Sequence, residues 1–481
     1  MDTNKRGQWG SNFGFLMATI GAAIGLGNLW AFPYKMGKGG GFAFLVLYLI
    51  MVAVAGVALM LGEFAIGRKT GLGAGKAYAA IGKKYRFIGT IAGIVPFIIL
   101  SFYCVLGGMV LRYCLGFLLQ LLGRDGFSGQ GSGFFGTLLY DGKATILFFL
   151  LFLVITMTVV MGGVQGGIER FSKAAMPALA VILVVIIVFV AIQPGAEEGY
   201  AFMFKPDLYY FSNPEIFFST LKTASGQMFF SLSIAMGINI TFGSYLDKKR
   251  SLQKNAVVVP LADTLFALLA GMMIMPACAA FGVDYGSGPG LLFVSMQKVF
   301  LDGMGGFTGN LMGFLFFFLV FIAAITSSIG LLEVLTSWVV DTQMEKGKEP
   351  SRKRASMLFA AGILLLGLPV CLDALGSGGA TIPAPYELFG LTTDSPSYAV
   401  WNDCWLDFYD MISEGFLMPV GGLLMVLMLG WKKPDLVKDE CEASGLRFRG
   451  RQFFRFCYRY LIPVVLAVVL YAQITSFFNL S

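Results

Sequence analysis

The sequence contains no histidine and little charge. Only 13% of its 481 residues are Asp, Glu, Lys or Arg, whereas soluble domains carry about a quarter. A water-soluble chain of this length could not cover its surface with so few charges. The lack of histidine excludes histidine metal ligands and histidine proton relays. The seven cysteines form no C-x-x-C pair, so the sequence predicts neither a disulfide framework nor a zinc site.

Long apolar runs, rich in glycine and phenylalanine, make up most of the chain. The 62 Gly and 46 Phe residues suit helices that pack closely in lipid. Apolar runs of about 18 residues or more are typical of membrane-spanning helices. Hydrophobic windows predict eleven spans, near residues 12–36, 41–67, 87–122, 144–162, 172–192, 217–243, 255–281, 307–340, 356–372, 405–430 and 457–478.

Lysine and arginine are unevenly distributed among the segments that join these spans. If the N-terminus lies inside, the inner segments hold most of the 35 Lys and Arg residues. This positive-inside pattern predicts a cytoplasmic N-terminus and, with eleven spans, an extracellular C-terminus. The net charge of +7 then faces anionic lipid and does not indicate nucleic-acid binding. Short cytoplasmic ends and few glycosylation motifs favour a prokaryotic plasma (inner) membrane.

Two of the predicted spans are interrupted by small and polar residues, in matching places of two halves. The interruptions cover residues 21–28 and 231–237. Hydrocarbon offers no hydrogen-bond partners, so the freed backbone groups need other ones. A kinked and closely packed helix is one explanation, and a bound ion with a charged small molecule is the other. Paired interruptions of this kind are typical of the binding site of a secondary transporter.

The two halves also predict how the chain is organised. Spans 1–5 and 6–10 each begin with an interrupted span, and an odd number of spans per half makes the second half inverted. We expect a first inverted repeat at residues 1–192. A second repeat with longer extracellular loops is expected at 193–430, and a peripheral eleventh span at 431–481.

Five short motifs follow one another along the chain, at residues 25–30, 62–68, 101–103, 226–233 and 326–328. In these motifs and their order the chain resembles the neurotransmitter:sodium symporter family, in particular its bacterial LeuT-like amino acid transporters. The resemblance implies an all-α membrane protein with the LeuT fold. That fold is a 5+5 inverted repeat with eleven transmembrane helices, of which helices 1 and 6 are unwound at mid-membrane. It further implies sodium-coupled symport of an amino acid by alternating access.

The resemblance also implies two sodium ions. The first ion would be held by the substrate carboxylate together with Ala23, Asn28, Ser231 and Asp263. The second would be held by backbone carbonyls and hydroxyl groups of Gly21, Ile24, Ala323, Thr326 and Ser327. Such all-oxygen shells suit a hard cation. Taken alone, the Thr-Ser-Ser sequence is more often a contact between helices than an ion site.

Asp263 is the most informative single residue. A carboxylate at mid-membrane depth is costly, so such residues usually mark ion pathways. The alternative is an acid near the cytoplasmic interface or paired with a lysine. Family members that need chloride have a neutral residue here and hold chloride at the positions of Tyr48, Gln227 and Ser231. The carboxylate of Asp263 therefore implies transport without chloride.

The resemblance places the substrate beside the two interruptions. Gly25 stands where monoamine transporters carry an aspartate, which favours a substrate with its own carboxylate. Apolar side chains then favour a neutral hydrophobic or aromatic L-amino acid, although core packing is the alternative reading for each residue alone. The implied pocket consists of Ala23, Leu26, Gly27, Ile99, Tyr103, Phe230, Ser231, Ser233, Met236, Ser327 and Leu331.

Gates are implied on both sides of the pocket. On the outside, Tyr103 and Phe230 would form a lid, and Asp410 one arm of a salt bridge. The family's Trp-Arg-Phe-Pro sequence is replaced here by Trp-Ala-Phe-Pro, with Ala31 at the arginine position. Lys35, one helical turn later, is a possible substitute; alternatively, the gate is weaker. The implied inner gate consists of Arg6, Trp9, Ser244, Tyr245 and Asp341.

Other function classes fit the sequence less well. An enzyme would need a catalytic set at one interface, and no nucleophile motif is present. A channel would need a continuous polar pore, but the polar residues within the spans cluster at one depth. A receptor that uses a transporter fold without transport stays open. The expected partners are an amino acid and membrane lipid, with no nucleic acid, and the expected state is a monomer or weak homodimer.

Overall fold

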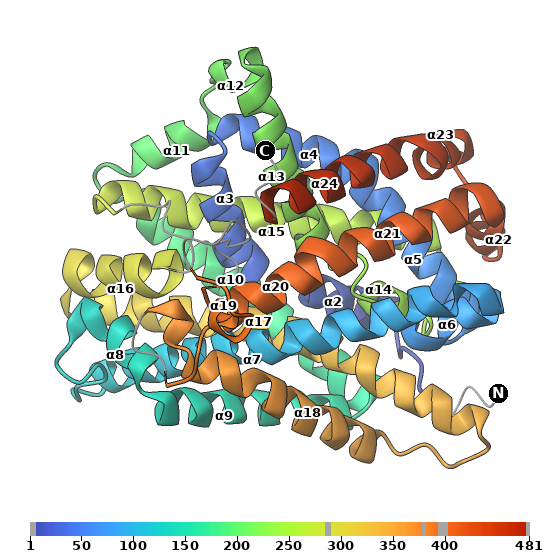
Figure 1. Cartoon of the computed structure of the whole chain (residues 1–481). Coiled ribbons are helices and arrows are strands. Elements are labelled where there is room, and N and C mark those ends of the chain that lie inside the picture. The colour runs from blue at the N-terminus through green and yellow to red at the C-terminus, as the bar shows by residue number, and fades with distance from the viewer. Residues whose placement is uncertain (1–5, 284–289, 378–380, 393–402, 478–481) are drawn as a thin grey trace.

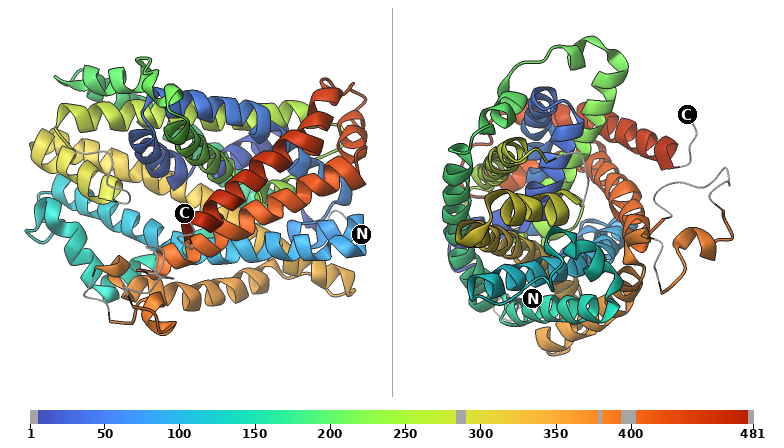
Figure 2. Two further views of the ribbon diagram at one scale, coloured as in Figure 1. Left: turned by 45° about the horizontal axis from the view of Figure 1, so that its top comes forward. Right: turned by 90° about the vertical axis from the view of Figure 1, so that its left-hand side faces the viewer.

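The computed structural model describes residues 6–283, 290–377, 381–392 and 403–477. Within these ranges every regular element is a helix. Most of the long helices run lengthwise through the molecule (Figure 1), and the right-hand view of Figure 2 shows them nearly end-on as one bundle. Helices α6 and α22 lie at one end of the bundle, here called the α6 end (Figure 1). Helices α8 and α16 lie at the other, called the α8 end (Figure 1).

The first half of the described chain contains helices and short π or 3-10 turns (η). In order, these are α2 (Asn12–Ala23), η1 (Gly27–Ala31), α3 (Phe32–Lys38), α4 (Phe42–Met51), η2 (Val52–Gly56), α5 (Val57–Thr70), α6 (Ala74–Ile81), η3 (Lys83–Tyr85), α7 (Arg86–Leu121), η4 (Gly131–Gly133), α8 (Phe134–Tyr140), α9 (Gly142–Met161), η5 (Val164–Glu169), α10 (Arg170–Ala191), α11 (Ala196–Phe204) and α12 (Tyr209–Ser212).

The second half continues in the same manner. Its elements are α13 (Pro214–Ser231), α14 (Ile238–Gly243), α15 (Leu252–Ala280), η6 (Leu291–Ser295), α16 (Met296–Lys298), η7 (Val299–Met304), α17 (Gly306–Glu345), α18 (Arg352–Leu372), η8 (Ala374–Gly376), α19 (Pro385–Leu388), α20 (Trp405–Asp410), η10 (Met411–Leu417), α21 (Met418–Leu427), η11 (Met428–Lys432), α22 (Leu436–Glu442), α23 (Arg451–Phe456), η12 (Cys457–Leu461) and α24 (Ile462–Phe477).

Nine helical stretches of the described residues are long and apolar enough to cross a membrane. Asn12–Ala23 together with Gly27–Lys38 forms a tenth candidate that is bent by 50°. The sixth predicted span is divided between α13 and α14, and neither part meets the same test. The structure therefore supports nine to ten spans by length and composition, and the count of eleven stays a prediction.

The first predicted break lies between α2 and η1. The hydroxyl of Ser11 caps α2 by accepting a hydrogen bond from the backbone N–H of Gly14 at 2.9 Å. The helix ends at Ala23, because Ile24 adopts an extended conformation with φ −75° and ψ 104°. Helical structure resumes at Gly27. The sequence prediction of an interrupted first span is thus confirmed.

The second predicted break separates α13 from α14 and is also confirmed. Ser233 and Ala235 have positive φ angles of 51° and 63°, a conformation that costs an L-residue about 1 kcal/mol or more. The buried carboxylate of Glu63 stabilises this segment. One of its oxygens accepts the backbone N–H of Ala235 and the other accepts the amide of Asn239, each at 2.9 Å. A distant helix, α5, therefore holds the unwound segment in place.

The two broken spans lie at the centre of the bundle. Helix α2 packs against α10, α15 and α17, and α14 packs against α5, α6 and α17. The most extensive contact between helices joins α7 to α17. This arrangement brings the breaks at 24–26 and 232–237 to the same interior region as the middle of α7 and α17.

Candidate functional site

A small cavity lies between the two helix breaks. The volume of this cavity is about 20 Å³. Ten of the eleven predicted substrate residues line it, and the exception is Ser231. Three further residues, Ala22, Gly25 and Ile238, complete its wall. A bulky ligand therefore needs the surrounding side chains or the unwound backbone at 235–237 to move.

Glycine is the residue that fits position 25. A Cβ atom there would overlap the Ser327 hydroxyl and lie 2.8 Å from the Tyr103 hydroxyl. The same Tyr103 hydroxyl accepts a hydrogen bond from the backbone N–H of Leu26 at 3.3 Å. An aspartate at position 25 would collide with both hydroxyl groups. Polar groups thus gather on the side of the cavity that faces the first break.

Three of the four residues of the first predicted sodium site, Asn28, Ser231 and Asp263, are in contact with one another. Asp263 is fully buried. One of its carboxylate oxygens accepts the Asn28 amide at 2.8 Å, and the other accepts the Ser231 hydroxyl at 2.7 Å. The Asn28 side-chain oxygen accepts the backbone N–H of Gly25 at 3.2 Å, so it faces the helix break. Ser231 thus belongs to this oxygen cluster and not to the cavity wall.

Of the three positions that the resemblance links to chloride, Tyr48 and Ser231 contact the same carboxylate, whereas Gln227 contacts the first helix break. The Tyr48 hydroxyl donates to Asp263 at 3.5 Å. The amide nitrogen of Gln227 donates to the backbone carbonyl of Gly27 at 3.0 Å, and its side-chain oxygen is buried without a hydrogen-bond partner. The Asp263 carboxylate thus lies within hydrogen-bond distance of the Tyr48 and Ser231 hydroxyl groups.

The groups of the second predicted sodium site join α2 to α17. The Ser327 hydroxyl donates to the Ile24 carbonyl at 3.2 Å. The Thr326 hydroxyl donates to the Ala323 carbonyl at 2.9 Å. A Cβ atom at Gly21 would lie 3.2 Å from the Thr326 Cβ, so these two residues are also adjacent. Carbonyl and hydroxyl oxygens from both helices thus meet where Ile24 leaves the helix.

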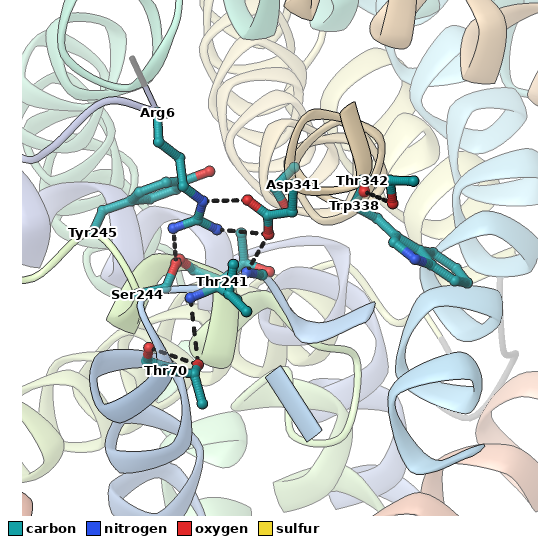
Figure 3. A network of polar contacts seen from close by, with 12 residues as sticks. Arg6, Thr70, Thr241, Ser244, Tyr245, Trp338, Asp341 and Thr342 are labelled. Carbon is teal, nitrogen blue, oxygen red and sulfur yellow. Dashed lines mark hydrogen bonds and ion pairs between the residues drawn. The ribbon is translucent and has the colours of Figure 1, made fainter. Parts of the chain in front are cut away.

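Four of the five predicted inner-gate residues, Arg6, Ser244, Tyr245 and Asp341, lie side by side (Figure 3). Asp341 also accepts the backbone N–H of Gly73, just before α6, at 2.7 Å, so the network lies at the α6 end. The Arg6 guanidinium donates to Asp341 at 2.5 and 3.1 Å and to the Ser244 hydroxyl at 2.8 Å. Burial lowers the pKa of Arg6, but Tyr245 and Asp341 raise it, and its net pKa lies above the ordinary value. The Trp9 indole donates to the Phe242 carbonyl at 3.0 Å. Residues before α2 are therefore fastened to α17 and to the end of α14.

Two charged residues that the sequence analysis missed extend this network. The Tyr245 hydroxyl donates to Glu333 at 2.6 Å, and Glu333 also forms an ion pair with Arg352. Glu333 is completely buried. In the sequence, Glu333 is visible as an acid within the apolar run of α17. Its partners Tyr245 and Arg352 lie in two other segments, so the sequence alone did not reveal the contacts.

A second cavity lies on the other side of Phe230, and Phe230 lines both cavities. This second cavity, of about 190 Å³, is lined by Lys35, Asp410 and Glu414, among others. The Lys35 ammonium lies 5.9 Å from the centre of the Phe230 ring. Among the described residues, Lys35 forms no ion pair within 4.0 Å with either acid. Glu414 was not predicted, although it follows Asp410 by one helical turn.

Known proteins resemble the chain over most of its length. A sequence model of the sodium:neurotransmitter symporter family matches residues 6–123 and 140–384. The sodium-dependent transporter YhdH of Bacillus subtilis (strain 168) is 32% identical over 98% of both chains. A sodium-dependent transporter of Haemophilus influenzae (strain ATCC 51907 / DSM 11121 / KW20 / Rd) is 30% identical over 98% of this chain and 99% of its own.

Similarity to a solved structure extends to the fold as well as the sequence. That structure is MhsT in complex with L-phenylalanine, which is 33% identical to this chain and superposes with a TM-score of 0.82. The similarity covers 97% of this chain and all of MhsT.

Proposed function

Since this chain belongs to the sodium:neurotransmitter symporter family, we propose that it imports a neutral, hydrophobic or aromatic L-amino acid together with sodium. The chain is a multi-pass membrane transporter with the LeuT fold, it depends on sodium, and it is not an enzyme. The observation that carries the proposal is the cavity between the two helix breaks, with oxygen clusters beside it.

The wall of that cavity supports the substrate class. Backbone N–H groups at the first break and the Tyr103 hydroxyl are suited to a carboxylate. Ile99, Met236 and Leu331 provide an apolar compartment, and methionine adapts to bulky shapes. Phenylalanine is bound in the similar protein MhsT. These observations favour an amino acid with an apolar or aromatic side chain.

The oxygen clusters support two sodium ions and no chloride. Ala23, Asn28, Ser231 and Asp263 would hold the first ion together with the substrate carboxylate. Gly21, Ile24, Ala323, Thr326 and Ser327 would hold the second ion. Since the substrate is itself a ligand of the first ion, sodium and substrate binding are coupled directly. The Asp263 carboxylate supplies the negative charge that chloride provides in other members of the family.

The two ends of the bundle support a cycle of alternating access. The Arg6–Asp341 network closes the α6 end, which the distribution of Lys and Arg assigns to the cytoplasm. Lys35, Asp410 and Phe230 would act at the other end, facing the outside. We assign the two repeats to residues 1–192 and 193–430, the peripheral helix to 431–481, and the location to a prokaryotic plasma membrane. The protein would act as a monomer or weak homodimer.

Transport into liposomes tests this proposal. Purified protein in vesicles with an inward sodium gradient should accumulate labelled phenylalanine or another apolar amino acid. Unlabelled substrate inside should accelerate entry of label by exchange. A protein that binds the amino acid with sodium but shows neither uptake nor exchange would be a receptor and would contradict the proposal.

A further inference from the structure

An apolar groove lies at the α6 end of the molecule, remote from the transport site. It lies between the start of α7 and the end of η11 and has a volume of about 590 Å³. Phe87, Leu427 and Trp431 contribute to it with exposed fractions of 51%, 39% and 50%. Aliphatic and aromatic side chains exposed in this way on a membrane protein are suited to contact with acyl chains.

The rim of the groove lies at the ends of two candidate membrane spans. Lys84 lies just before α7, and Lys432 is the last residue of η11, so both mark the ends of membrane spans. Tyr85 and Trp431 accompany them, and these aromatic residues are typical of the membrane–water interface. The Trp431 indole is held in place because it donates to the Arg459 carbonyl at 3.1 Å.

The charged side chains that line the groove are all positive. Its lining contains Lys84 and Lys432 and no acidic residue. Neither lysine forms an ion pair in the part of the chain that the structure describes. The Arg459 guanidinium lies 4.5 Å from the centre of the Trp431 ring and adds a third positive charge nearby. An anionic ligand with an apolar tail would satisfy both the lysines and the apolar floor.

From this combination we propose that the groove binds an anionic phospholipid. Its phosphate would lie between Lys84 and Lys432, and one acyl chain would lie along Phe87 and Leu427. Basic pockets at the cytoplasmic ends of membrane helices are known to hold such headgroups. Assignment to the inner leaflet rests on the proposed orientation of the chain, whereas binding itself does not.

Native mass spectrometry of the full-length protein, released from detergent, tests this site. Phosphatidylglycerol and phosphatidylcholine with identical acyl chains are the probes, offered singly and in competition. We expect phosphatidylglycerol to bind at least about tenfold more tightly, because its net negative charge is attracted by both lysines. The double variant Lys84→Gln/Lys432→Gln should lose this preference.

A matched control removes two other lysines from the same end of the molecule. Lys346→Gln/Lys348→Gln changes two exposed residues between α17 and α18 that lie outside the groove, and it should keep the preference. Equal binding of the two lipids to the wild type, or equal loss in both double variants, would overturn the proposal. So would a protein dimer that dissociates in the groove variant, because a second copy would then cover this face.

Sodium-dependent amino acid binding is measured in the same samples. It should persist in both double variants, since neither touches the transport site. Lipid preference and amino acid binding are therefore tested separately, and a failure of one leaves the result for the other intact.

Discussion

The Asn28 amide donates a 2.8 Å hydrogen bond to the buried Asp263 carboxylate, which joins the broken first span to α15. This contact places the Asp263 carboxyl group beside the helix break. The same carboxylate accepts the Ser231 hydroxyl from the second broken span. A single acid thus connects three segments at the point where sodium and the substrate carboxylate are proposed to bind.

Chloride dependence tests the role of that acid. Wild-type uptake should be unchanged when chloride is replaced by gluconate. Asp263→Asn should reduce uptake at least tenfold in gluconate, and chloride should restore part of it, because an anion can then replace the missing charge. Asp263→Glu is the matched control and should stay independent of chloride. A wild-type protein that requires chloride would contradict this assignment.

The fit of glycine at position 25 can be tested by adding one methyl group. Gly25→Ala should weaken amino acid binding by about tenfold or more, since its Cβ would overlap the Ser327 hydroxyl. Gly136→Ala is the matched control, because a Cβ at that helical position meets no atom within 4 Å. Isothermal titration in sodium buffer measures both variants. Unchanged affinity in Gly25→Ala would show that the substrate does not occupy this cavity.

The inner gate should open when its ion pair is removed. Arg6→Ala leaves the buried Asp341 without its charged partner, a change that costs about 3–5 kcal/mol. All seven native cysteines are buried, so a cysteine introduced as Thr241→Cys beneath the gate reports access of a water-soluble maleimide. Arg6→Ala in that background should accelerate labelling strongly. Lys76→Ala removes the more exposed pair with Glu345 and should change labelling little. Equal labelling rates in the Arg6→Ala and Lys76→Ala variants would contradict the assignment of the Arg6–Asp341 pair as the inner gate.

The outer gate should be weaker than in relatives that carry an arginine at position 31. Ala31→Arg should supply a charge-assisted pair with Asp410, worth up to a few kcal/mol when partly buried, and should slow release of the substrate to the outside. Lys35→Ala should accelerate release, because Lys35 shares a cavity with Asp410 and Glu414. Lys38→Ala, on the same helix, serves as control. If Lys35→Ala releases substrate at the wild-type rate, Phe230 and Tyr103 close the site without help from Lys35.

The sequence was sufficient to predict the two helix breaks because their cause is local. Glycine and polar residues interrupt otherwise apolar runs, and the structure places the breaks at Ile24 and at 232–237, within the predicted intervals. The approach of α17 to the first break could be expected only from the family resemblance. Apolar windows alone do not tell which span lies next to which.

The residues that sequence analysis missed depend on contacts between distant segments. Glu63 supports the second break through Ala235 and Asn239, about 170 positions away. Glu333 joins Tyr245 to Arg352. In each case a single acid in an apolar run was visible in the sequence, but its hydrogen-bond partners were not. The same limit applies to Glu414, which shares a cavity with Lys35 only because α3 and η10 meet in three dimensions.

The most direct test of sodium-coupled binding is a titration with phenylalanine in solutions that differ only in their cation. Without a sodium ion between them, the substrate carboxylate and the Asp263 carboxylate would repel each other. We therefore predict saturable binding in sodium chloride and no measurable binding in potassium or choline chloride. Affinity should rise steeply with sodium concentration, because substrate and ion share the first site. Undiminished phenylalanine binding in potassium chloride would contradict the central claim that the substrate completes a sodium site.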